Sequence, residues 1–381
     1  MKKFITRLIT IIALLVVGLY LTGTDYILKA VQTVYLQGNT TASIDDYTFF
    51  ENKTINIGKS KAWPLHKNYN KIPATEKLLE LHKSQGTVAY LIIKNDSILF
   101  ESYYDGYNEN SKSNSFSMAK SYVSGLLGKA IMDGYIKNID QPVSDFFPQY
   151  KEGLGAKVTV GDLASMASGS SWKESYYSPF TITTRAYFGK ELEKAILGLT
   201  TVEVPGKSFK YASGDTQLLA MVIEKATGKK LYNYLSESFW VPLESENQAL
   251  WQIDSETNDM VKAYCCMASN AKDFARFGKL YKDHGKWNGE QLIPTDFVGQ
   301  ATDRLNTNAQ GTSYGYFWWR HNMQVGNRMY DCQSGRGAGG QFILMLPELD
   351  LIIIVTSQQR GMGNMLASIP RQLLPAFVRS K

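Results

Sequence analysis

Two groups of β-type residues lie at opposite ends of this chain, and one sheet can use both groups only if the fold brings the two ends together. Residues 85–105 and 341–357 are rich in β-branched and aromatic residues arranged in short runs. From about residue 136 to residue 310 the pattern changes to helices and long loops broken by Gly and Pro. The sequence therefore predicts an α/β (α+β) fold with one sheet from both ends and a mostly helical lobe inserted between them.

The first group has the pattern of a β-hairpin. Residues 88–94 and 98–104 are two β-type runs, and Asn95 and Asp96 lie at their junction. Asn and Asp are favoured in tight turns, so these two runs are expected to pair with each other.

Helices are expected around these strands. Apolar residues at helical spacing predict a first helix at 74–84, a long helix over 117–133 that stops at Gly134, and a last helix over 362–378. Together they suggest a sheet that is flanked by helices.

The N-terminus combines a basic start with an uncharged, apolar run. Lys2, Lys3 and Arg7 precede residues 8–24, which are mostly Leu, Ile and Val and contain no charge. Residues 1–24 are therefore either a secretory signal peptide or an uncleaved membrane anchor, and the lack of a clean A-x-A cleavage site favours the anchor. Because positive charge stays in the cytoplasm, both alternatives predict export to the periplasmic or extracytoplasmic face of the inner membrane.

The rest of the chain divides into a lead-in and a folded domain. Residues 25–35 form an amphipathic stretch, and residues 38–70 are polar and irregular, so residues 25–70 are expected to be a linker and lead-in segment. The domain proper is expected over residues 71–381, a length that can hold two compact lobes.

Composition excludes several classes of function. The net charge of +6 is small for 381 residues, and no basic stripe interleaved with aromatic residues is present, so nucleic acid is not an expected partner. The four histidines are scattered, and neither H-E-x-x-H nor C-x-x-C occurs. We therefore expect no metal site and no cofactor.

The three cysteines are too few for a disulfide framework. In an oxidising compartment Cys332 could bond to Cys265 or to Cys266, and buried free thiols are an equally good alternative. The sequence leaves this choice open.

The most informative local motif is Ser117-Met118-Ala119-Lys120, which opens the helix expected over 117–133. Residues three apart share one face of a helix, so the amine at 120 can reach the hydroxyl at 117 and act as its base without any histidine. An exposed lysine has a pKa near 10.4, so a pKa near 7 requires about 4 kcal/mol of differential interaction. The same spacing recurs in two places that lack this setting: Ser170…Lys173 and Ser269…Lys272.

Further motifs follow in a fixed order along the chain. These motifs are Ser117-Met118-Ala119-Lys120, Tyr211-Ala212-Ser213-Gly214-Asp215 and Gly337-Ala338-Gly339-Gly340-Gln341. With these motifs the chain resembles, from about residue 50 onward, the serine β-lactamase and penicillin-binding-protein superfamily on its class C-like side. That side includes D-alanyl-D-alanine peptidases, β-lactamase-like carboxylesterases and 6-aminohexanoate-dimer hydrolases, of which the last are the most similar. The resemblance implies a β-lactamase/transpeptidase-like fold, with an antiparallel sheet flanked by helices and a mostly helical second lobe.

The resemblance also implies catalytic roles. Ser117 would be the acylated nucleophile, Lys120 its base, and Tyr211 the proton shuttle between nucleophile and leaving group, since a phenol both donates and accepts a proton. The backbone amides of Ser117 and Ala338 would form the oxyanion hole. Only its place in the order of motifs distinguishes Tyr211 from the other Tyr-x-Ser triplets, which begin at Tyr122, Tyr176 and Tyr234.

Two departures from the β-lactamase pattern bear on the substrate. The Lys-Thr-Gly triplet that holds a β-lactam carboxylate is absent, and Ser213 stands where class C enzymes have asparagine. Arg336, the nearby cation, pairs either with a substrate carboxylate or with a surface acid. The candidate substrate-binding residues are Ser213, Arg336, Gly339, Gln341 and Trp172, the last from an aromatic loop at 172–180 that is a candidate lid.

The sequence therefore predicts a serine hydrolase that forms an acyl-enzyme on Ser117 and cleaves a small ester, a linear amide or a peptide. The alternatives are a D-alanyl-D-alanine peptidase or weak β-lactamase, and a non-catalytic, membrane-anchored binding domain on the same scaffold. A Ser-His-Asp hydrolase is disfavoured because no G-x-S-x-G elbow is present. The membrane is an expected partner if residues 1–24 are retained, and the sequence does not determine the oligomeric state.

Overall fold

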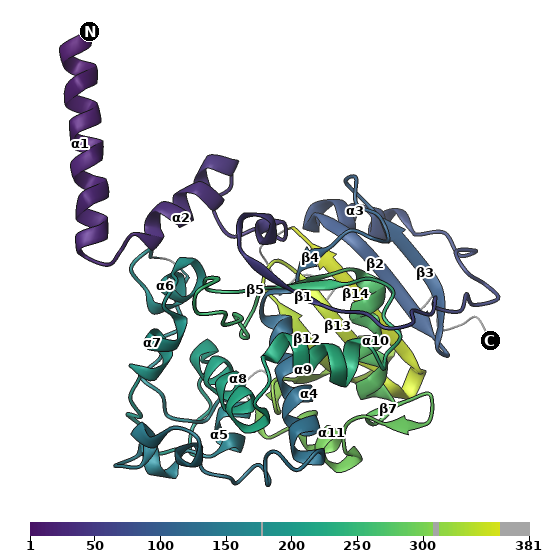
Figure 1. Ribbon diagram of the computed structural model, residues 1–381. Coiled ribbons are helices and arrows are strands. Elements are labelled where there is room, and N and C mark those ends of the chain that lie inside the picture. Colours follow the sequence, from purple (N-terminus) through teal and green to yellow (C-terminus); the bar gives the residue numbers. More distant parts are fainter. Residues whose placement is uncertain (177, 308–311, 359–381) are drawn as a thin grey trace.

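The structure is a computed structural model, and it describes residues 1–381 except 177, 308–311 and 359–381. In these residues an eight-stranded sheet has the order β3-β2-β14-β13-β12-β11-β10-β9, and every neighbouring pair is antiparallel (Figure 1). Its strands in chain order are β2 (Thr87–Lys94), β3 (Ser97–Tyr103), β9 (Asn306–Thr307), β10 (Ser313–Tyr314), β11 (Trp319–Val325), β12 (Arg328–Gly337), β13 (Gln341–Leu346) and β14 (Leu351–Ser357).

The two ends of the chain meet inside this sheet, as the sequence predicts. β14 lies beside β2, with Ile353 opposite Ile92, so strands from both groups form one continuous sheet. The expected hairpin of β2 and β3 is present, and Asn95 and Asp96 adopt the left-handed conformation with φ of 49° and 56°. Turns of that hand match the right-handed twist of the strands.

Strands β9 to β12 were missed by sequence reasoning. In β11, for example, Met323 and Val325 are buried whereas Gln324 is exposed, and the start of the strand is only partly buried. Strands of this kind have no continuous apolar run, so their pattern does not stand out from the loops around them.

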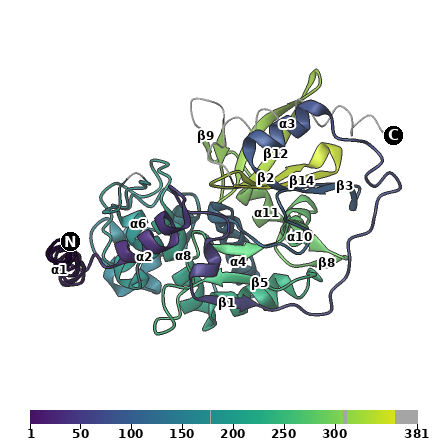
Figure 2. The same cartoon turned by 90° about the horizontal axis from the view of Figure 1, so that it is seen from above.

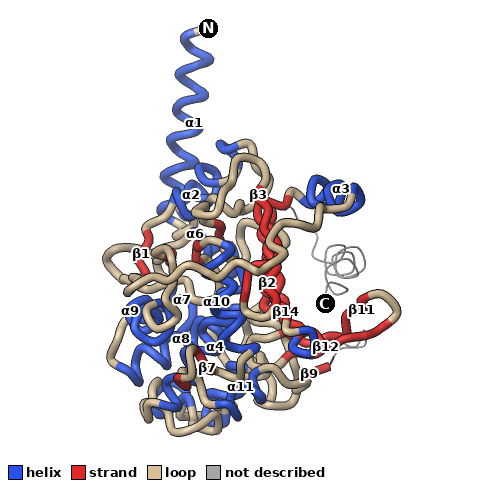
Figure 3. Tube along the Cα trace, turned by 90° about the vertical axis from the view of Figure 1, so that its right-hand side faces the viewer, coloured by secondary structure: helices blue, strands red, loops and turns tan. Residues whose placement is uncertain are grey.

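Helices cover both faces of the sheet (Figure 3). On one face α10 (Ala271–Lys282) packs on β13 and β14, so closely that a methyl group at Gly278 would lie 2.8 Å from a side-chain carbon of Ile343. On the other face α3 (Glu76–Gln85) lies beside β2 and agrees with the helix expected at 74–84. The helix expected at 362–378 falls outside the described residues.

The central helix α4 (Ala119–Met132) lies between the sheet and the helical lobe (Figure 2). It occupies the helix expected over 117–133, nearly all of its residues are buried, and Gly134 follows its end with φ 78°. The other helices around it are α5 (Val160–Ala164), α6 (Ile182–Phe188), α7 (Leu192–Leu197), α8 (Ser213–Thr227), α9 (Leu231–Leu235) and α11 (Thr295–Ala301). Two small sheets complete the described fold: β1 (Asn52–Ile55), β5 (Ala249–Gln252), β6 (Met267–Ser269) and β4 (Ser113–Asn114) in that spatial order, and the hairpin β7 (Lys286–Trp287) with β8 (Glu290–Gln291).

Much of the segment expected to be a linker, residues 25–70, belongs to the folded body. α2 (Tyr26–Thr33) lies against α6 and buries Tyr26 and Ala30. β1 pairs with β5, and its Ile55 is fully buried in the main core. The apolar residues of this segment have no single periodicity in the sequence, yet several of them are buried against the folded body.

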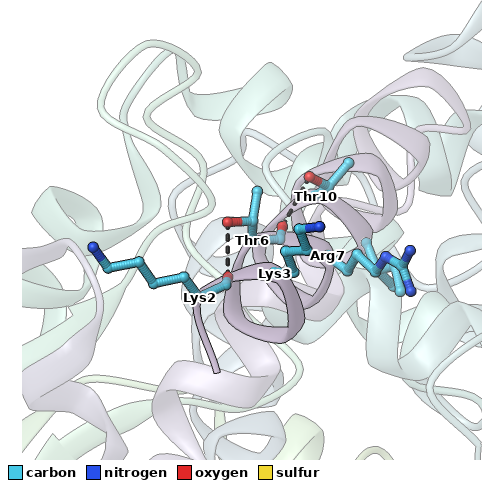
Figure 4. A pocket seen from close by; sticks show the side chains of 6 residues that line it. Lys2, Lys3, Thr6, Arg7 and Thr10 are labelled. Carbon is cyan, nitrogen blue, oxygen red and sulfur yellow. Dashed lines mark hydrogen bonds between the residues drawn. The ribbon is translucent and has the colours of Figure 1, made fainter.

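The N-terminal helix α1 (Lys2–Leu21) extends away from the rest of the protein (Figure 1), and none of its residues is buried. In the described part of the chain it is the one helix long and apolar enough to cross a membrane. The hollow in Figure 4 is lined by residues of α1 alone, among them Lys2, Arg7 and Thr10, so it has no wall from the folded body. An exposed apolar helix fits either the signal peptide or the anchor expected over 1–24.

The cysteines pair in a way that sequence reasoning did not consider. Cys265 and Cys266, which are adjacent in the chain, form a disulfide with each other. Cys332 is a buried free thiol on β12, and burial raises its pKa to about 12. Neither of the two possible pairings of Cys332 is therefore formed, and for this cysteine the alternative of a buried free thiol holds.

We expect Ile55→Ala to lower the free energy of unfolding by about 2–5 kcal/mol, because it deletes a fully buried side chain from the core. Denaturant unfolding followed by tryptophan fluorescence measures this change. Leu36→Ala is the matched control from the same segment; Leu36 is 73% exposed, so this variant should unfold like the wild type. If Ile55→Ala left the stability unchanged, residues 25–70 would behave as the linker that the sequence suggests.

Candidate active site

Ser117 lies in a short turn between a strand and the central helix. The 3-10 turn Phe116–Met118 joins β4 to α4. Phe116 has φ 44°, a left-handed conformation that is strained for a bulky side chain. Asn114 supports this turn, because its Oδ1 accepts a hydrogen bond from the backbone N–H of Phe116 at 3.0 Å. Ser117 is partly exposed between buried neighbours, so a substrate can approach it.

Lys120 lies one turn further along and is almost completely buried, at 1% exposure. Its Nζ is 3.1 Å from Ser117 Oγ and donates a second hydrogen bond to the carbonyl oxygen of Tyr264 at 2.7 Å. Burial lowers the pKa of Lys120 from 10.5 to about 8, and the negative charge of Glu174 opposes this shift. In the described residues no carboxylate forms an ion pair with Lys120, so a fraction of the amine is neutral near pH 7.

The other two copies of the motif have different surroundings. Lys173 is exposed to solvent. Lys272 forms ion pairs with Glu109 at 2.6 Å and with Glu101 at 3.3 Å, and these raise its pKa. Neither lysine is a buried amine without a carboxylate partner, as Lys120 is, so the geometry favours the copy at Ser117.

Tyr211 is the third side chain beside Ser117 and Lys120. It lies just before α8, its ring is 5.2 Å from Lys120 Nζ, and its phenol is hydrogen-bonded to Ser117. The ring stacks on Trp319 with centroids 6.0 Å apart, which holds it in place. Burial and the negative charge of Glu174 raise the pKa of Tyr211 above 10, while the hydrogen bond to Ser117 lowers it. Tyr211 is therefore a neutral phenol at physiological pH and can donate a proton.

The tyrosines of the other Tyr-x-Ser triplets lie elsewhere. Tyr122 is fully buried within α4, and Tyr234 donates a hydrogen bond to Asp133 at 3.1 Å. Tyr176 is 64% exposed and donates to Glu174. The position of Tyr211 beside Ser117 and Lys120 agrees with the role expected from the order of motifs.

Glu174 was missed by sequence reasoning, and it organises the loop next to Tyr211. Its carboxylate accepts hydrogen bonds from the backbone N–H of Ser213 at 2.8 Å, from Ser213 Oγ at 2.9 Å, from Trp172 Nε1 at 2.6 Å and from the phenol of Tyr176. Trp172 is fully buried, so it packs the loop and is not exposed to a substrate. The same bonds occupy the hydroxyl of Ser213. A lone acid in an aromatic-rich loop carries no sequence signal for this arrangement.

The charge of Glu174 also acts on Lys120 and Tyr211. It favours the protonated form of Lys120 and disfavours the ionised form of Tyr211, raising the pKa of both. Glu174 therefore has two effects: it positions the start of α8, and it sets the electrostatic potential at the base and the phenol.

The turn between β12 and β13 approaches the nucleophile. Gly337 lies so close that a methyl group there would come 2.1 Å from the carbonyl oxygen of Ser115. Ala338 follows Gly337 directly and is exposed. This proximity is compatible with the expected role of the Ala338 amide in an oxyanion hole.

Gln341 and Gly339 shape the same turn. Gln341 is fully buried, and its Nε2 donates to the carbonyl oxygens of Ala338 at 3.2 Å and of Ser357 at 2.6 Å. Gly339 has φ 75°, which only glycine adopts readily. Both residues therefore hold the backbone of the turn. The side-chain amide of Gln341 donates its hydrogen bonds to the protein backbone and not to a substrate.

Arg336 does not pair with a surface acid among the described residues, which was one of the two partners considered for it. Its guanidinium lies 2.8 Å from His321 Nδ1, donates to Ser334 Oγ at 2.9 Å, and lies 5.1 Å from the Trp319 ring. In the described residues no carboxylate forms an ion pair with it. Successive side chains of a strand point to opposite faces, and Gly335 faces α4, so Arg336 is directed away from α4.

Comparison with known proteins bears on the family and the fold. The family model described as beta-lactamase matches residues 75–375. The 6-aminohexanoate-dimer hydrolase of Paenarthrobacter ureafaciens is 25% identical over 308 residues, which are 75% of this chain and 76% of that protein. The solved structure of a putative 6-aminohexanoate-dimer hydrolase from Bacillus anthracis has a TM-score of 0.74 at 20% identity, covering 86% of this chain and 90% of that one. EstCE1, a hydrolase with promiscuous acyltransferase activity, has a TM-score of 0.62 at 14% identity over 78% of this chain and 96% of its own.

We expect acylation of Ser117 to depend on the protonation of Lys120. Because burial lowers the lysine pKa to about 8, the amine is mostly protonated below that pH and mostly neutral above it. The second-order rate constant should fall about tenfold per pH unit below about pH 8 and level off above it. The rate constant for labelling by an active-site phosphonate, measured from about pH 6 to about pH 10, gives this profile. A rate independent of pH across this window would remove Lys120 as the base.

Glu174→Gln should move the midpoint of that profile to lower pH, because the charge of Glu174 favours the protonated lysine. Gln keeps the size of the side chain and part of its hydrogen bonding, so the loop should remain folded. Glu76→Gln, at an exposed position on α3, is the matched control and should leave the midpoint unchanged. A change in rate without any shift in midpoint would show that Glu174 acts only through loop structure.

Proposed function

The chain belongs to the beta-lactamase family, and we propose that it is a serine hydrolase that forms an acyl-enzyme on Ser117 and cleaves esters or linear amides. The observation that carries the proposal is the contact between the buried Lys120 amine and the Ser117 hydroxyl at 3.1 Å. With a pKa of about 8, roughly a tenth of this lysine is neutral at pH 7. The nucleophile therefore has a working base in hydrogen-bond contact.

Acylation follows from these positions. Ser117 Oγ attacks the carbonyl carbon of the substrate while the lone pair of Lys120 Nζ takes the hydroxyl proton. As the tetrahedral intermediate collapses, the bond from carbon to the leaving oxygen or nitrogen breaks, and the phenol of Tyr211 protonates that atom. The proton on Lys120 restores the phenol. In deacylation water attacks the acyl carbon, the same groups transfer protons in reverse, and the acid is released with Ser117 regenerated.

The oxyanion formed in each step needs preorganised donors. We assign this role to the backbone N–H groups of Ser117 and Ala338. The closeness of Gly337 to the nucleophile turn supports this assignment, and the bonds of Gln341 to Ala338 and Ser357 keep the turn rigid.

The substrate class follows from what β12 presents to the nucleophile. On the side that faces α4 and Ser115 this strand carries Gly335 and Gly337, and a methyl group at Gly335 would already lie 3.1 Å from Ser121 Oγ. Arg336 points to the other face and is bonded to His321. Arg336 lies 5.1 Å from the Trp319 ring, which stacks on Tyr211, but its guanidinium is already hydrogen-bonded to Ser334 and His321. The lysine of the Lys-Thr-Gly triplet, which holds a β-lactam carboxylate beside the scissile bond, is replaced in this strand by a glycine. This favours esters and linear amides.

Two alternatives have less support. For a D-alanyl-D-alanine peptidase or a β-lactamase, this chain lacks the Lys-Thr-Gly lysine that would bind the carboxylate of the substrate. A non-catalytic binding domain does not require a buried lysine in contact with a serine and a phenol, so this arrangement favours an enzyme. The similarity to the 6-aminohexanoate-dimer hydrolase of Paenarthrobacter ureafaciens supports linear amides as substrates.

The location of the enzyme is part of the proposal. The basic start and the exposed apolar surface of α1 support export, with the catalytic body on the periplasmic or extracytoplasmic side. The membrane then holds the enzyme if α1 is retained.

Labelling with a fluorophosphonate and mass spectrometry test the assignment of Ser117. We expect one adduct, on Ser117, and its complete loss in Ser117→Ala. Ser170→Ala and Ser269→Ala are the matched controls from the other two copies of the motif and should label normally. An adduct on either of these serines, or none at all, would contradict the proposal.

A small substrate panel tests the class. We expect p-nitrophenyl esters or 6-aminohexanoate dimer to be hydrolysed with a kcat/KM at least about a hundredfold above that for nitrocefin and D-alanyl-D-alanine, the scale of one missing charge-assisted contact. Comparable values for nitrocefin and esters would overturn the substrate class while leaving the nucleophile in place.

A further inference from the structure

The residues at 264–267 touch both the base and the turn that carries the nucleophile. The carbonyl oxygen of Tyr264 accepts a hydrogen bond from Lys120 Nζ at 2.7 Å. The carbonyl oxygen of Met267 accepts one from the backbone N–H of Ser115, also at 2.7 Å. The internal geometry of this one segment therefore sets the distance between the amine and the nucleophile turn.

The disulfide between Cys265 and Cys266 lies in the middle of this segment. A bond between neighbouring cysteines closes a small ring through the peptide group that joins them, so rotation about that part of the backbone is blocked. Cys266 has φ 74°, a conformation that residues other than glycine rarely adopt without an outside constraint. Both cysteines are buried, at 5% and 0% exposure.

The ring is also fixed to its surroundings. Trp251 Nε1 donates to the carbonyl oxygen of Cys265 at 2.9 Å, and the backbone N–H of Gln252 donates to that of Cys266 at 3.1 Å. Both donors belong to β5, so the segment cannot shift as a whole. The freedom that remains is rotation within the segment itself, and this is the freedom that the disulfide removes.

We propose that the Cys265–Cys266 disulfide is a positioning element for Lys120, which holds the Tyr264 carbonyl where it orients the amine toward Ser117. This inference rests on the proposed function, because it assumes that Lys120 is the base. With the bond closed the enzyme acylates at its full rate; with the bond open the carbonyl moves and acylation slows.

The physical reason lies in the geometry of a neutral amine. Lys120 can take the proton of Ser117 only through the lone pair of its nitrogen, and an N–H held by the Tyr264 carbonyl determines where that lone pair points. A displacement of about 1 Å in a catalytic group can reduce the rate about a hundredfold. A backbone carbonyl has no rotamer of its own, so only the backbone around it can keep it in place.

Opening of the bond is an ordinary thiol–disulfide exchange. A dithiol reductant attacks one sulfur, the bond between the two cysteine sulfurs breaks, and a mixed disulfide forms. The second thiol of the reductant then displaces the cysteine, which leaves two thiols on the protein and one disulfide in the reductant. An exported enzyme meets oxidising conditions, which keep the bond closed.

Thiol titration of the denatured, full-length protein tests the bond. Without reductant we expect one thiol in the wild type, that of Cys332, and none in Cys332→Ser. After treatment with a dithiol reductant the wild type should show three. Three thiols in the untreated protein would overturn the inference.

Single-turnover labelling of Ser117 tests the positioning role. Reduction of the wild type should slow acylation at least about tenfold, with little change in the label concentration that gives half the maximal rate. Removal of the reductant in air should restore the rate. Cys332→Ser is the matched control and should respond as the wild type does, since Cys332 lies on the face of β12 that points away from α4. The double variant Cys265→Ser, Cys266→Ser should be slow with or without reductant.

Two further results separate the possible failures. If the double variant is folded by circular dichroism, acylates at the wild-type rate and shows the wild-type pH profile, the inference is wrong while the proposed function stands. If that variant does not fold, the reversible reduction of the wild type decides in its place, and a rate unchanged by a bond that titration shows to be open overturns the inference. Absence of labelling in the untreated wild type overturns the proposed function, and this inference with it.

Discussion

The proposed chemistry of this protein depends on one amine that is kept away from water. Lys120 is buried without a carboxylate partner in the described residues, and a fall of its pKa from 10.5 to about 8 corresponds to about 3 kcal/mol against the charged form. The negative charge of Glu174 opposes this effect, and burial is the larger of the two. In water the same lysine would be protonated at neutral pH, and Ser117 would have no base. Other features of the site matter through what they do to this amine or to the hydroxyl beside it.

Burial of Lys120 requires three distant parts of the chain. The lysine comes from α4, Tyr264 from the connection between β5 and β6, and Tyr211 from the approach to α8. The turn after β12 adds a fourth part next to the nucleophile. These parts meet because β14 pairs with β2, which closes the chain ends into one sheet and leaves α4 between the sheet and the helical lobe. The antiparallel sheet thus provides a rigid wall for a site whose side chains come from the start of α4 and from the helical lobe.

Two residues beside this amine and its serine have a left-handed backbone conformation. Phe116 precedes the nucleophile with φ 44°, and Cys266 follows the carbonyl that binds Lys120 with φ 74°. Each is supported by a specific contact, the first by the side chain of Asn114 and the second by the disulfide to Cys265. Strained residues persist only where their surroundings hold them, and such places occur most often at functional sites. The strain here is consistent with a nucleophile and base that are fixed before a substrate arrives.

The sequence by itself determined the outline of this protein. The β-type runs at 85–105 and 341–357, the turn at Asn95 and Asp96, and the serine and lysine one helical turn apart are local patterns. Period, turn chemistry and spacing can be read without knowing what lies nearby, so the sheet from both ends, α4 and the Ser117–Lys120 pair were all predictable. Strands β9 to β12 and the burial of Ile55 in β1 were not, because half-exposed strands and scattered apolar residues carry no periodic signal.

Only the tertiary structure decided which local patterns matter. The motif at Ser117 differs from its copies at Ser170 and Ser269 in that its lysine is buried and in contact with its serine, and burial is a property of the whole fold. The same is true of Glu174, whose partners come from its own loop and from the start of α8. It is also true of the pairing of Cys265 with Cys266, which leaves Cys332 as a free thiol. A pKa depends on desolvation and on charges brought close in space, and neither quantity is encoded by neighbours in the sequence alone.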